Sequence, residues 1–312
     1  MKTKRPHSKP ILVTGAHRSG TTWVGTILAE ARGVGIIHDP TNPAIQRAGV
    51  CTAHFSRYFT CITTENEDIY VDAFRSMLQF DFQYSSALKA IRTPKDVAKV
   101  VRDAWVVRKA GKDARCALVK DATALFTAEW FAHRFDANIV IMVRHPAAFA
   151  GSLKRMNWLA DFRDFLDQPL LMRDHLGPFE EELQDAVAQP PDLIGQAILL
   201  WRMLYYSIDR YRKAHPEWSV VRHEDISADP VGRFRELYGV LGLDYTTEIE
   251  QTIIASSSKG TVTVDDQRPH VLRRDSMANI KAWKKRLSEE EVARIREGTR
   301  DVAPLFYSDA DW

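Results

Sequence analysis

The chain has few cysteines and no long apolar run, and each scarcity narrows the class of protein. Its 312 residues include three cysteines, Cys51, Cys61 and Cys116, an odd number without metal-ligand spacing. Reduced thiols in a cytoplasmic compartment fit that pattern better than a disulfide framework does. No segment approaches the roughly 18–20 apolar residues of a membrane span, and no signal peptide precedes the first apolar segment. We therefore expect a cytoplasmic protein without a membrane span.

The chain also has little excess charge. Lys and Arg number 43 against 41 Asp and Glu, which gives a net charge of +2. That balance gives no reason to expect a nucleic acid or an anionic membrane as partner. Residues 1–10 carry four basic side chains and two prolines. We interpret them as a disordered basic tail, with a targeting arm as the weaker alternative, before a single domain at residues 11–312.

The order of apolar segments predicts an α/β protein. Strand-like and helix-like segments alternate without repeats or low-complexity stretches, which favours a parallel sheet of about five strands between helices. We expect strands at residues 11–14, 34–37, 116–119, 138–143 and 219–222. We expect helices at 21–32, 94–109, 125–135, 146–156 and 192–214, from 230 onward, and after a capping box at Ser288 and Glu291. Residues 40–115 and 157–190 are predicted to be insertions in this fold that wall the site of the substrate.

A glycine-rich turn joins the first strand to the first helix. Gly15 and Gly20 have the G-x-x-x-x-G spacing of a phosphate-binding loop, whose backbone N–H groups and helix N-terminus attract an anion. A nucleoside-triphosphate loop has lysine after the second glycine, but here Thr21 stands there. The cation is Arg18, inside the loop. The alternative interpretation is an ordinary strand–helix turn with two convenient glycines.

A second cation follows the fourth strand. Arg144 ends an apolar segment, Pro146 begins a helix, and Ser152 lies on that helix eight residues after Arg144. A guanidinium fork and a hydroxyl in this arrangement can hold one phosphate. Taken singly, Arg144 is equally explained as an ion-paired arginine at a sheet edge and Ser152 as a surface helix serine. Both residues together, downstream of the loop, favour a second phosphate site.

These two motifs resemble the sulfotransferase family. His17-Arg18-Ser19-Gly20-Thr21-Thr22-Trp23 is similar to its 5′-phosphosulfate loop, and Arg144-His145-Pro146 with Ser152 is similar to its 3′-phosphate motif. Arg18 in place of lysine resembles the tyrosylprotein, Golgi and bacterial branches. The resemblance implies a three-layer P-loop NTPase-like fold and 3′-phosphoadenosine 5′-phosphosulfate (PAPS) as the sulfo donor, with no metal.

The resemblance also suggests contacts to the rest of the nucleotide. Trp23 corresponds to a tryptophan that stacks on adenine, although a core tryptophan is the competing interpretation. His223 stands where the family has an aromatic residue that approaches the adenine. Arg274 and Ser276 resemble its last phosphate-contacting segment, at a different spacing.

Catalytic candidates come from the carboxyl ends of the predicted strands, where open α/β sheets bind ligands. Arg18 and Lys120 are expected to stabilise the charge that builds during in-line displacement, with Ser19 and Thr22 in support. For the base that deprotonates the acceptor we favour Asp39, then His38, then Asp121. Asp39 is otherwise a turn residue, and for Asp121 a helix cap is the stronger interpretation.

The sequence therefore predicts transfer of the sulfo group of PAPS to a hydroxyl, or less favourably an amine, with adenosine 3′,5′-bisphosphate as product. The acceptor is a small molecule, a glycan or a peptide. A P-loop kinase or NTPase is the first alternative, with the strand-end Asp121 as its magnesium ligand. A nucleotide-binding protein without catalysis is the second alternative.

Overall fold

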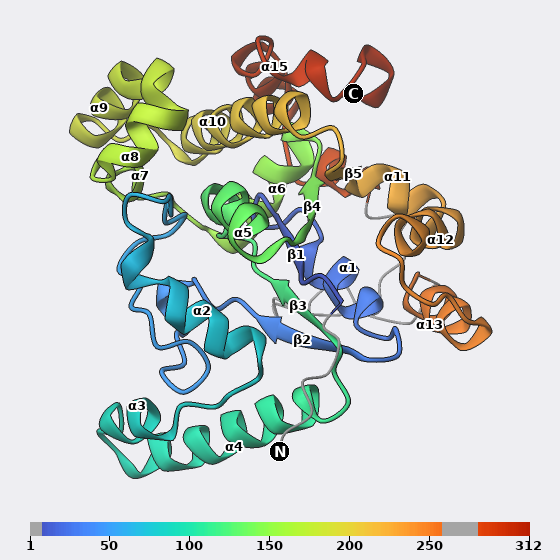
Figure 1. Ribbon diagram of the computed structural model, residues 1–312. Helices are drawn as coiled ribbons and strands as arrows, with labels where there is room; N and C mark the ends of the chain where they lie inside the picture. The colour runs from blue at the N-terminus through green and yellow to red at the C-terminus, as the bar shows by residue number, and fades with distance from the viewer. Residues whose placement is uncertain (1–7, 258–279) are drawn as a thin grey trace. The chain divides into compact units, whose positions relative to one another are not determined.

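The computed structural model describes residues 8–257 and 280–312 of the chain and contains a five-stranded parallel sheet (Figure 1). The strands lie in the order β2-β3-β1-β4-β5. They are β1 (Ile11–Gly15), β2 (Val34–His38), β3 (Cys116–Lys120), β4 (Asn138–Val143) and β5 (Ser219–Arg222). The register is parallel in each pairing β2–β3, β1–β3 and β4–β5, with Val13 opposite Lys120 and Val143 opposite Arg222.

Helices separate the strands, as the alternating pattern predicts. They are α1 (Thr21–Leu28), α2 (Val71–Leu78), α3 (Tyr84–Lys89), α4 (Pro94–Gly111), α5 (Ala128–Phe135), α6 (Pro146–Met156), α7 (Arg163–Leu166), α8 (Pro169–Leu171), α9 (Glu180–Ala188), α10 (Leu193–Ala214), α11 (His223–Ala228), α12 (Pro230–Val240), α13 (Thr247–Ser257) and α15 (Glu289–Gly298). One π-helical turn at Met172–Leu176 and several short 3₁₀ turns connect them. None of the helices in the described ranges combines the length and apolar character that a bilayer span needs.

The chain divides into two compact units. Unit 1 comprises Met1–Thr14 and Val24–Ile139, and unit 2 comprises Gly15–Trp23 and Val140–Trp312. The three cysteines lie in unit 1, where all are buried free thiols.

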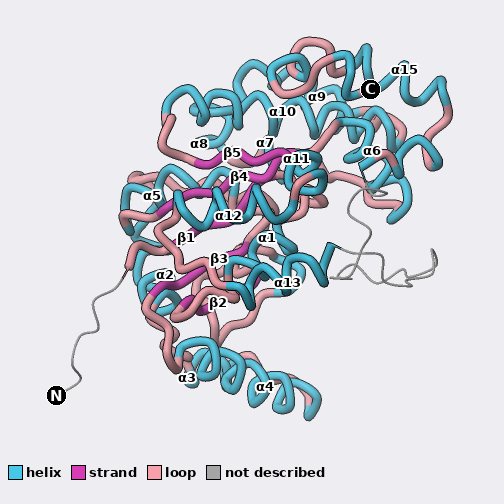
Figure 2. Tube along the Cα trace, turned by 90° about the vertical axis from the view of Figure 1, so that its right-hand side faces the viewer, coloured by secondary structure: helices cyan, strands magenta, loops and turns pink. Residues whose placement is uncertain are grey.

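Unit 1 shows how glycine allows close packing beside the sheet. Helix α4 begins with Pro94 after a Thr93–Asp96 capping box, and it packs on β2. Gly35 of β2 makes this approach possible, since a Cβ there would lie 2.6 Å from the carbonyl oxygen of Ala110 in α4. Figures 1 and 2 show α3 lying beside α4.

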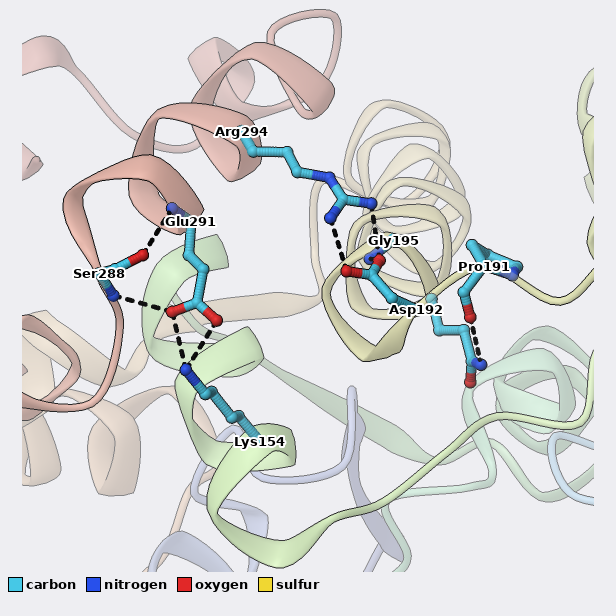
Figure 3. A network of polar contacts seen from close by, with 8 residues as sticks. Lys154, Pro191, Asp192, Gly195, Ser288, Glu291 and Arg294 are labelled. Atoms are coloured by element: carbon cyan, nitrogen blue, oxygen red, sulfur yellow. Dashed lines mark hydrogen bonds and ion pairs between the residues drawn. The ribbon is translucent and has the colours of Figure 1, made fainter.

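Unit 2 is built around the 22-residue helix α10, which packs against α6 and α15 (Figure 2). Asp192 caps α10 through the amide of Gly195 and also binds Arg294 of α15 at 2.6 Å (Figure 3). The buried side chains of Trp201 and Tyr205 in α10 bind the carbonyl of Arg144, just after β4, and the Tyr205 ring meets Phe306 of the C-terminal segment. These contacts fix α10 beside the end of β4.

The structure confirms the predicted fold class and the position of each predicted strand, but helix α1 is shorter than expected and further helices occur, among them α11. Helix α1 ends at Leu28 rather than near residue 32, because Gly33 takes a left-handed conformation (φ +81°) that turns the chain into β2. Residues 223–228, expected only as a segment after the fifth strand, form helix α11. Its first turn carries Glu224 and Asp225, which favour a helix N-terminus electrostatically.

Candidate active site

The glycine-rich turn of unit 2 has the strained backbone of an anion-binding loop. Gly15, Arg18 and Gly20 have φ values of +138°, +66° and +98°. A Cβ at Gly15 would lie 2.2 Å from the carbonyl oxygen of Met142, so only glycine fits there. Ser19, buried, donates to the carbonyl of Ala16 and closes the loop on itself. The positive φ angles and the close approach of Met142 therefore explain why glycine stands at positions 15 and 20.

The loop and the Arg144 motif form one polar cluster. Nε of Arg18 donates to Oγ of Ser152 at 3.0 Å, and Nη1 of Arg144 donates to the carbonyl oxygen of Arg18 at 2.5 Å. The Arg18 guanidinium also lies 5.6 Å from the ring centroid of Trp158, which follows α6. The two predicted phosphate motifs therefore meet, and their arginines lie in one cluster.

Arg144 is a buried arginine with an unsatisfied donor. Arg144 is 5% exposed, and its side-chain Nε makes no hydrogen bond to any described residue. Burial lowers the pKa of its guanidinium, whereas the charge of Glu224 acts in the opposite direction. Since a buried donor without an acceptor is costly, this geometry suits an anion ligand.

The backbone of Arg144 is held by helix α10. The amide of Arg144 donates to the hydroxyl of Tyr205, while its carbonyl accepts from that hydroxyl at 2.9 Å and from Nε1 of Trp201 at 3.0 Å. Both aromatic side chains are fully buried. They fix the end of β4 and thereby the root of the Arg144 side chain.

The residue after Arg144 is held by α11 and the C-terminal segment. The amide of His145 donates to Oε1 of Glu224 at 3.0 Å, and the hydroxyl of Tyr307 donates to Oε2 at 3.1 Å. The His145 ring stacks on Trp283 (centroids 5.5 Å apart, 12° between planes) and meets the edge of Trp312. Burial lowers the pKa of His145 to about 4, so the ring is neutral at pH 7.

Another histidine, inside the loop, is also neutral. Burial, followed by the charge of Arg18, lowers the pKa of His17 to about 4. Its ring packs 5.2 Å from Phe149 of α6. Arg18 rather than His17 therefore supplies the positive charge of the loop.

Trp23 and His223, the predicted adenine contacts, lie close together in unit 2. Their ring centroids are 6.4 Å apart, and Nε1 of Trp23 donates to Oγ of Ser256 at 3.1 Å. The Trp23 ring also meets Phe234 of α12 edge-on. A Cβ on Gly20 would lie 2.7 Å from Nδ1 of His223, so the loop glycine permits α11 to approach. Trp23 thus has core contacts as well as half-exposed surface.

In unit 1, Lys120 and Asp39 form a buried ion pair. Lys120 ends β3, Asp39 follows β2, and Nζ of Lys120 binds Oδ2 of Asp39. The two side chains are 3% and 14% exposed, so the pair is shielded from salt and water. Gly25 of α1 makes room for the lysine stem, since a Cβ there would lie 2.7 Å from its Cγ.

Asp121 has the environment of a structural carboxylate. Its two oxygens accept hydrogen bonds from the amides and hydroxyls of Thr41 and Thr123 at 2.7–2.9 Å. Burial, followed by the charge of Asp39, raises the pKa of its carboxyl. With all its acceptor directions used and no exposure, Asp121 ties the segment after β2 to the segment after β3.

His38, the other candidate base, is the half-buried last residue of β2. Its carbonyl accepts from Nη2 of Arg47 at 2.5 Å, which places a second cation near the Asp39 backbone turn (φ +45°). Burial lowers the pKa of Arg47, whereas the charges of Asp103 and Asp39 act in the opposite direction.

Two predicted site residues lie outside the described part of the chain. Arg274 and Ser276 lie in residues 258–279, outside the described ranges. Within the described ranges, no three His, Cys, Asp or Glu side chains gather as a metal site would require.

Sequence reasoning did not assign roles to four residues that support the cluster: Trp158, Trp201, Tyr205 and Glu224. Of these four, only Glu224 could have been identified from the sequence, because it lies beside His223 at a strand end. The two α10 residues are 57 and 61 positions from Arg144 and look like ordinary apolar-face residues.

The fold and this cluster define a class of protein. A parallel sheet of order 2-3-1-4-5, with a glycine-rich, arginine-bearing loop after its first strand, is an α/β fold of the P-loop NTPase-like class. The model of the Sulfotransferase family matches residues 10–247. The chain belongs to that family, whose chemistry is sulfo-group transfer.

Known structures include similar chains, while no match was found among curated protein sequences. The sulfotransferase domain of the olefin synthase from Synechococcus PCC 7002 matches at 15% identity and a TM-score of 0.47, over 99% of both chains. The sulfotransferase domain from the curacin biosynthetic pathway matches at 14% identity and a TM-score of 0.48, over 98% of this chain and 99% of that one. Mouse sulfotransferase SULT7A1, complexed with PAP, matches at 12% identity and 0.44, over 98% and 89%.

Proposed function

We propose that the chain transfers the sulfo group of PAPS to an acceptor hydroxyl and releases adenosine 3′,5′-bisphosphate. The observation that carries this proposal is the Arg18–Arg144–Ser152 cluster, in which a buried guanidinium retains an unsatisfied donor. Such donors favour a dianionic phosphate, and PAPS differs from ATP in carrying a phosphate on the 3′ oxygen, apart from the group on its 5′ oxygen.

In this proposal the predicted nucleotide-binding residues have separate roles. Arg144 and Ser152 hold the 3′-phosphate, while Arg18 and the loop residues Ser19, Gly20, Thr21 and Thr22 hold the 5′-phosphosulfate. Backbone N–H groups at the start of α1 add partial positive charge. His223 and Trp23 flank the adenine. Arg274 and Ser276 remain candidates for a further phosphate contact.

The ion pair of unit 1 supplies the proton chemistry in this proposal. Asp39 accepts the proton of the acceptor hydroxyl as the new O–S bond forms and the bond from sulfur to the leaving phosphate oxygen breaks. Lys120 then stabilises the negative charge on that oxygen. The saturated hydrogen bonds of Asp121 favour Asp39 over Asp121 as base, and His38 remains the second candidate.

A comparison of nucleotides tests this function. Adenosine 3′,5′-bisphosphate should raise the melting temperature of the protein, and ATP with Mg²⁺ should raise it little, because only a ligand of the folded state stabilises it. Screening hydroxyl and amine acceptors for PAPS-dependent release of the bisphosphate then identifies the acceptor class. A melting shift with ATP and Mg²⁺ alone would instead support a kinase or NTPase. Bisphosphate binding without turnover on any acceptor would support a non-catalytic nucleotide-binding protein.

A further inference from the structure

Helix α4 presents an apolar stripe to solvent. Val97, Val101 and Trp105 are spaced by four residues, so they lie on one face of the helix. They are 47%, 64% and 60% exposed, whereas Val107 and Asp103 on the opposite face are buried. Helix α4 packs on β2 and α3, and the exposed Trp105 side chain on its outer face contributes little to that packing.

The same region concentrates positive charge. Residues 89–112 contain eight Lys or Arg and two Asp, a net charge of +6, while the whole chain carries +2. The other residues together therefore carry −4. Both aspartates are already in ion pairs at 2.9 Å, Asp96 with Lys99 and Asp103 with Arg102. Lys109 lies 5.2 Å from the ring centroid of Trp105, so the charge flanks the stripe directly.

We propose that α4 lies on an anionic lipid surface, with Val97, Val101 and Trp105 in the acyl–headgroup boundary and the flanking lysines and arginines at the headgroups. An interfacial helix has apolar residues including tryptophan on one face and basic side chains around them, as α4 does. Like the other helices of the described ranges, α4 is not apolar enough to cross a bilayer. Each basic residue near an anionic surface strengthens binding about fivefold.

Charge separates this occupant from the alternatives. A second copy of the chain would bring two surfaces of charge +6 together, which repulsion opposes. An acidic polypeptide would satisfy the charge but not require the tryptophan stripe. Lipid satisfies both features at once. The inference does not depend on the sulfo donor, since none of these residues is among the proposed nucleotide-binding or catalytic residues.

Sedimentation with vesicles tests the proposal. The full chain should pellet with vesicles of phosphatidylcholine and phosphatidylglycerol (about 3:1) but not with phosphatidylcholine alone, and about 0.5 M salt should release it. Val101→Asp with Trp105→Asp should weaken binding at least tenfold. The matched control is Val240→Asp with Ile254→Asp, which adds the same charge at exposed apolar positions of α12 and α13 and should bind like the parent.

A second pair of variants isolates the charge. Lys95→Gln with Arg108→Gln should weaken vesicle binding about 25-fold, whereas Lys281→Gln with Lys285→Gln, exposed lysines of unit 2, should have little effect. Circular dichroism melting confirms that each variant is folded. The proposal is overturned if the parent does not pellet with anionic vesicles, or if the α4 variants and their controls behave alike. Binding to poly-glutamate, or a dimer abolished by the α4 substitutions, in the absence of vesicle binding, would also overturn it.

Discussion

At the scale of single residues, Arg144 combines a local motif with distant support. Its guanidinium is buried beside the loop, and its backbone is fixed by Trp201 and Tyr205. A buried cation held in place before any ligand binds loses little freedom on binding, which is how fixed groups favour affinity.

Arg144→Lys should therefore weaken binding of adenosine 3′,5′-bisphosphate by about 10- to 100-fold, the effect of losing one or two charge-assisted hydrogen bonds. Isothermal titration measures it. Arg300→Lys, on an arginine that is 75% exposed, is the control and should bind normally. Unchanged affinity in Arg144→Lys would remove this residue from the phosphate site.

Asp39 and Asp121 should respond differently to substitution. Asp39→Asn should lower kcat by about 10²–10⁴, with bisphosphate affinity nearly unchanged, since a general base contributes that range. Asp121→Ala should instead lower the free energy of unfolding by about 3–5 kcal/mol, because it leaves the donors of Thr41 and Thr123 buried without an acceptor. Urea unfolding and initial rates on both variants separate the two roles. Full activity in Asp39→Asn would favour His38 as the general base.

His145 makes stability depend on pH. Its folded-state pKa of about 4 lies below the ordinary value of 6.5, so between those values the unfolded chain binds the proton that the folded protein excludes. Stability should therefore rise as pH increases from 4 to 6.5. Between pH 7 and pH 5 the loss assigned to His145 is about 2 kcal/mol.

Urea unfolding of the parent and His145→Phe at pH 7 and pH 5 measures this contribution. Phenylalanine keeps the ring stacked on Trp283 but cannot take up a proton. The variant should lose about 2 kcal/mol less than the parent over that interval. Equal losses would mean that His145 is protonated in the folded protein.

At the scale of elements, the carboxylate of Glu291 in helix α15 forms an ion pair with α6 (Figure 3). Glu291 accepts from the amide of Ser288 at 2.8 Å, which completes the capping box, and binds Nζ of Lys154 through both oxygens. The sequence predicts the capping box, because Ser288 and Glu291 have its spacing. It does not predict Lys154, which lies 137 residues away.

Glu291→Ala should lower the free energy of unfolding by about 1–2 kcal/mol, from the lost cap and a partly exposed ion pair. Glu289→Ala removes a charge from the same helical turn without touching the box, so it should cost less than about 0.5 kcal/mol. Chemical denaturation of the two variants compares them directly. Equal costs would show that only the helix dipole matters.

At the scale of the whole molecule, the net charge is small but the basic residues are unevenly distributed along the chain. The concentration of basic residues at 89–112 is invisible in the net charge of +2. Local charge and exposure together, rather than totals, indicate where a partner of opposite sign would bind.

Hydrogen exchange on the whole chain tests where the nucleotide acts. Saturating adenosine 3′,5′-bisphosphate should slow exchange of the amides at residues 15–23 and 144–153, because bound ligand suppresses local opening. Helix α4 should exchange at an unchanged rate. Protection confined to other segments would contradict the assignment of the loop.

The sequence by itself determined the order of the strands along the chain, the glycine-rich loop, the Arg144–Ser152 spacing and the capping box at Ser288. These features are local, so steric rules and side-chain periodicity are enough to predict them. The tertiary structure alone decided that Arg18 donates to Ser152, that Asp39 pairs with Lys120, and that Asp121 is consumed by two threonines. The contacts of Arg18 with Ser152, Asp39 with Lys120 and Asp121 with Thr41 join residues 80 to 134 positions apart, and only folding of the sheet and its helices brings such residues together.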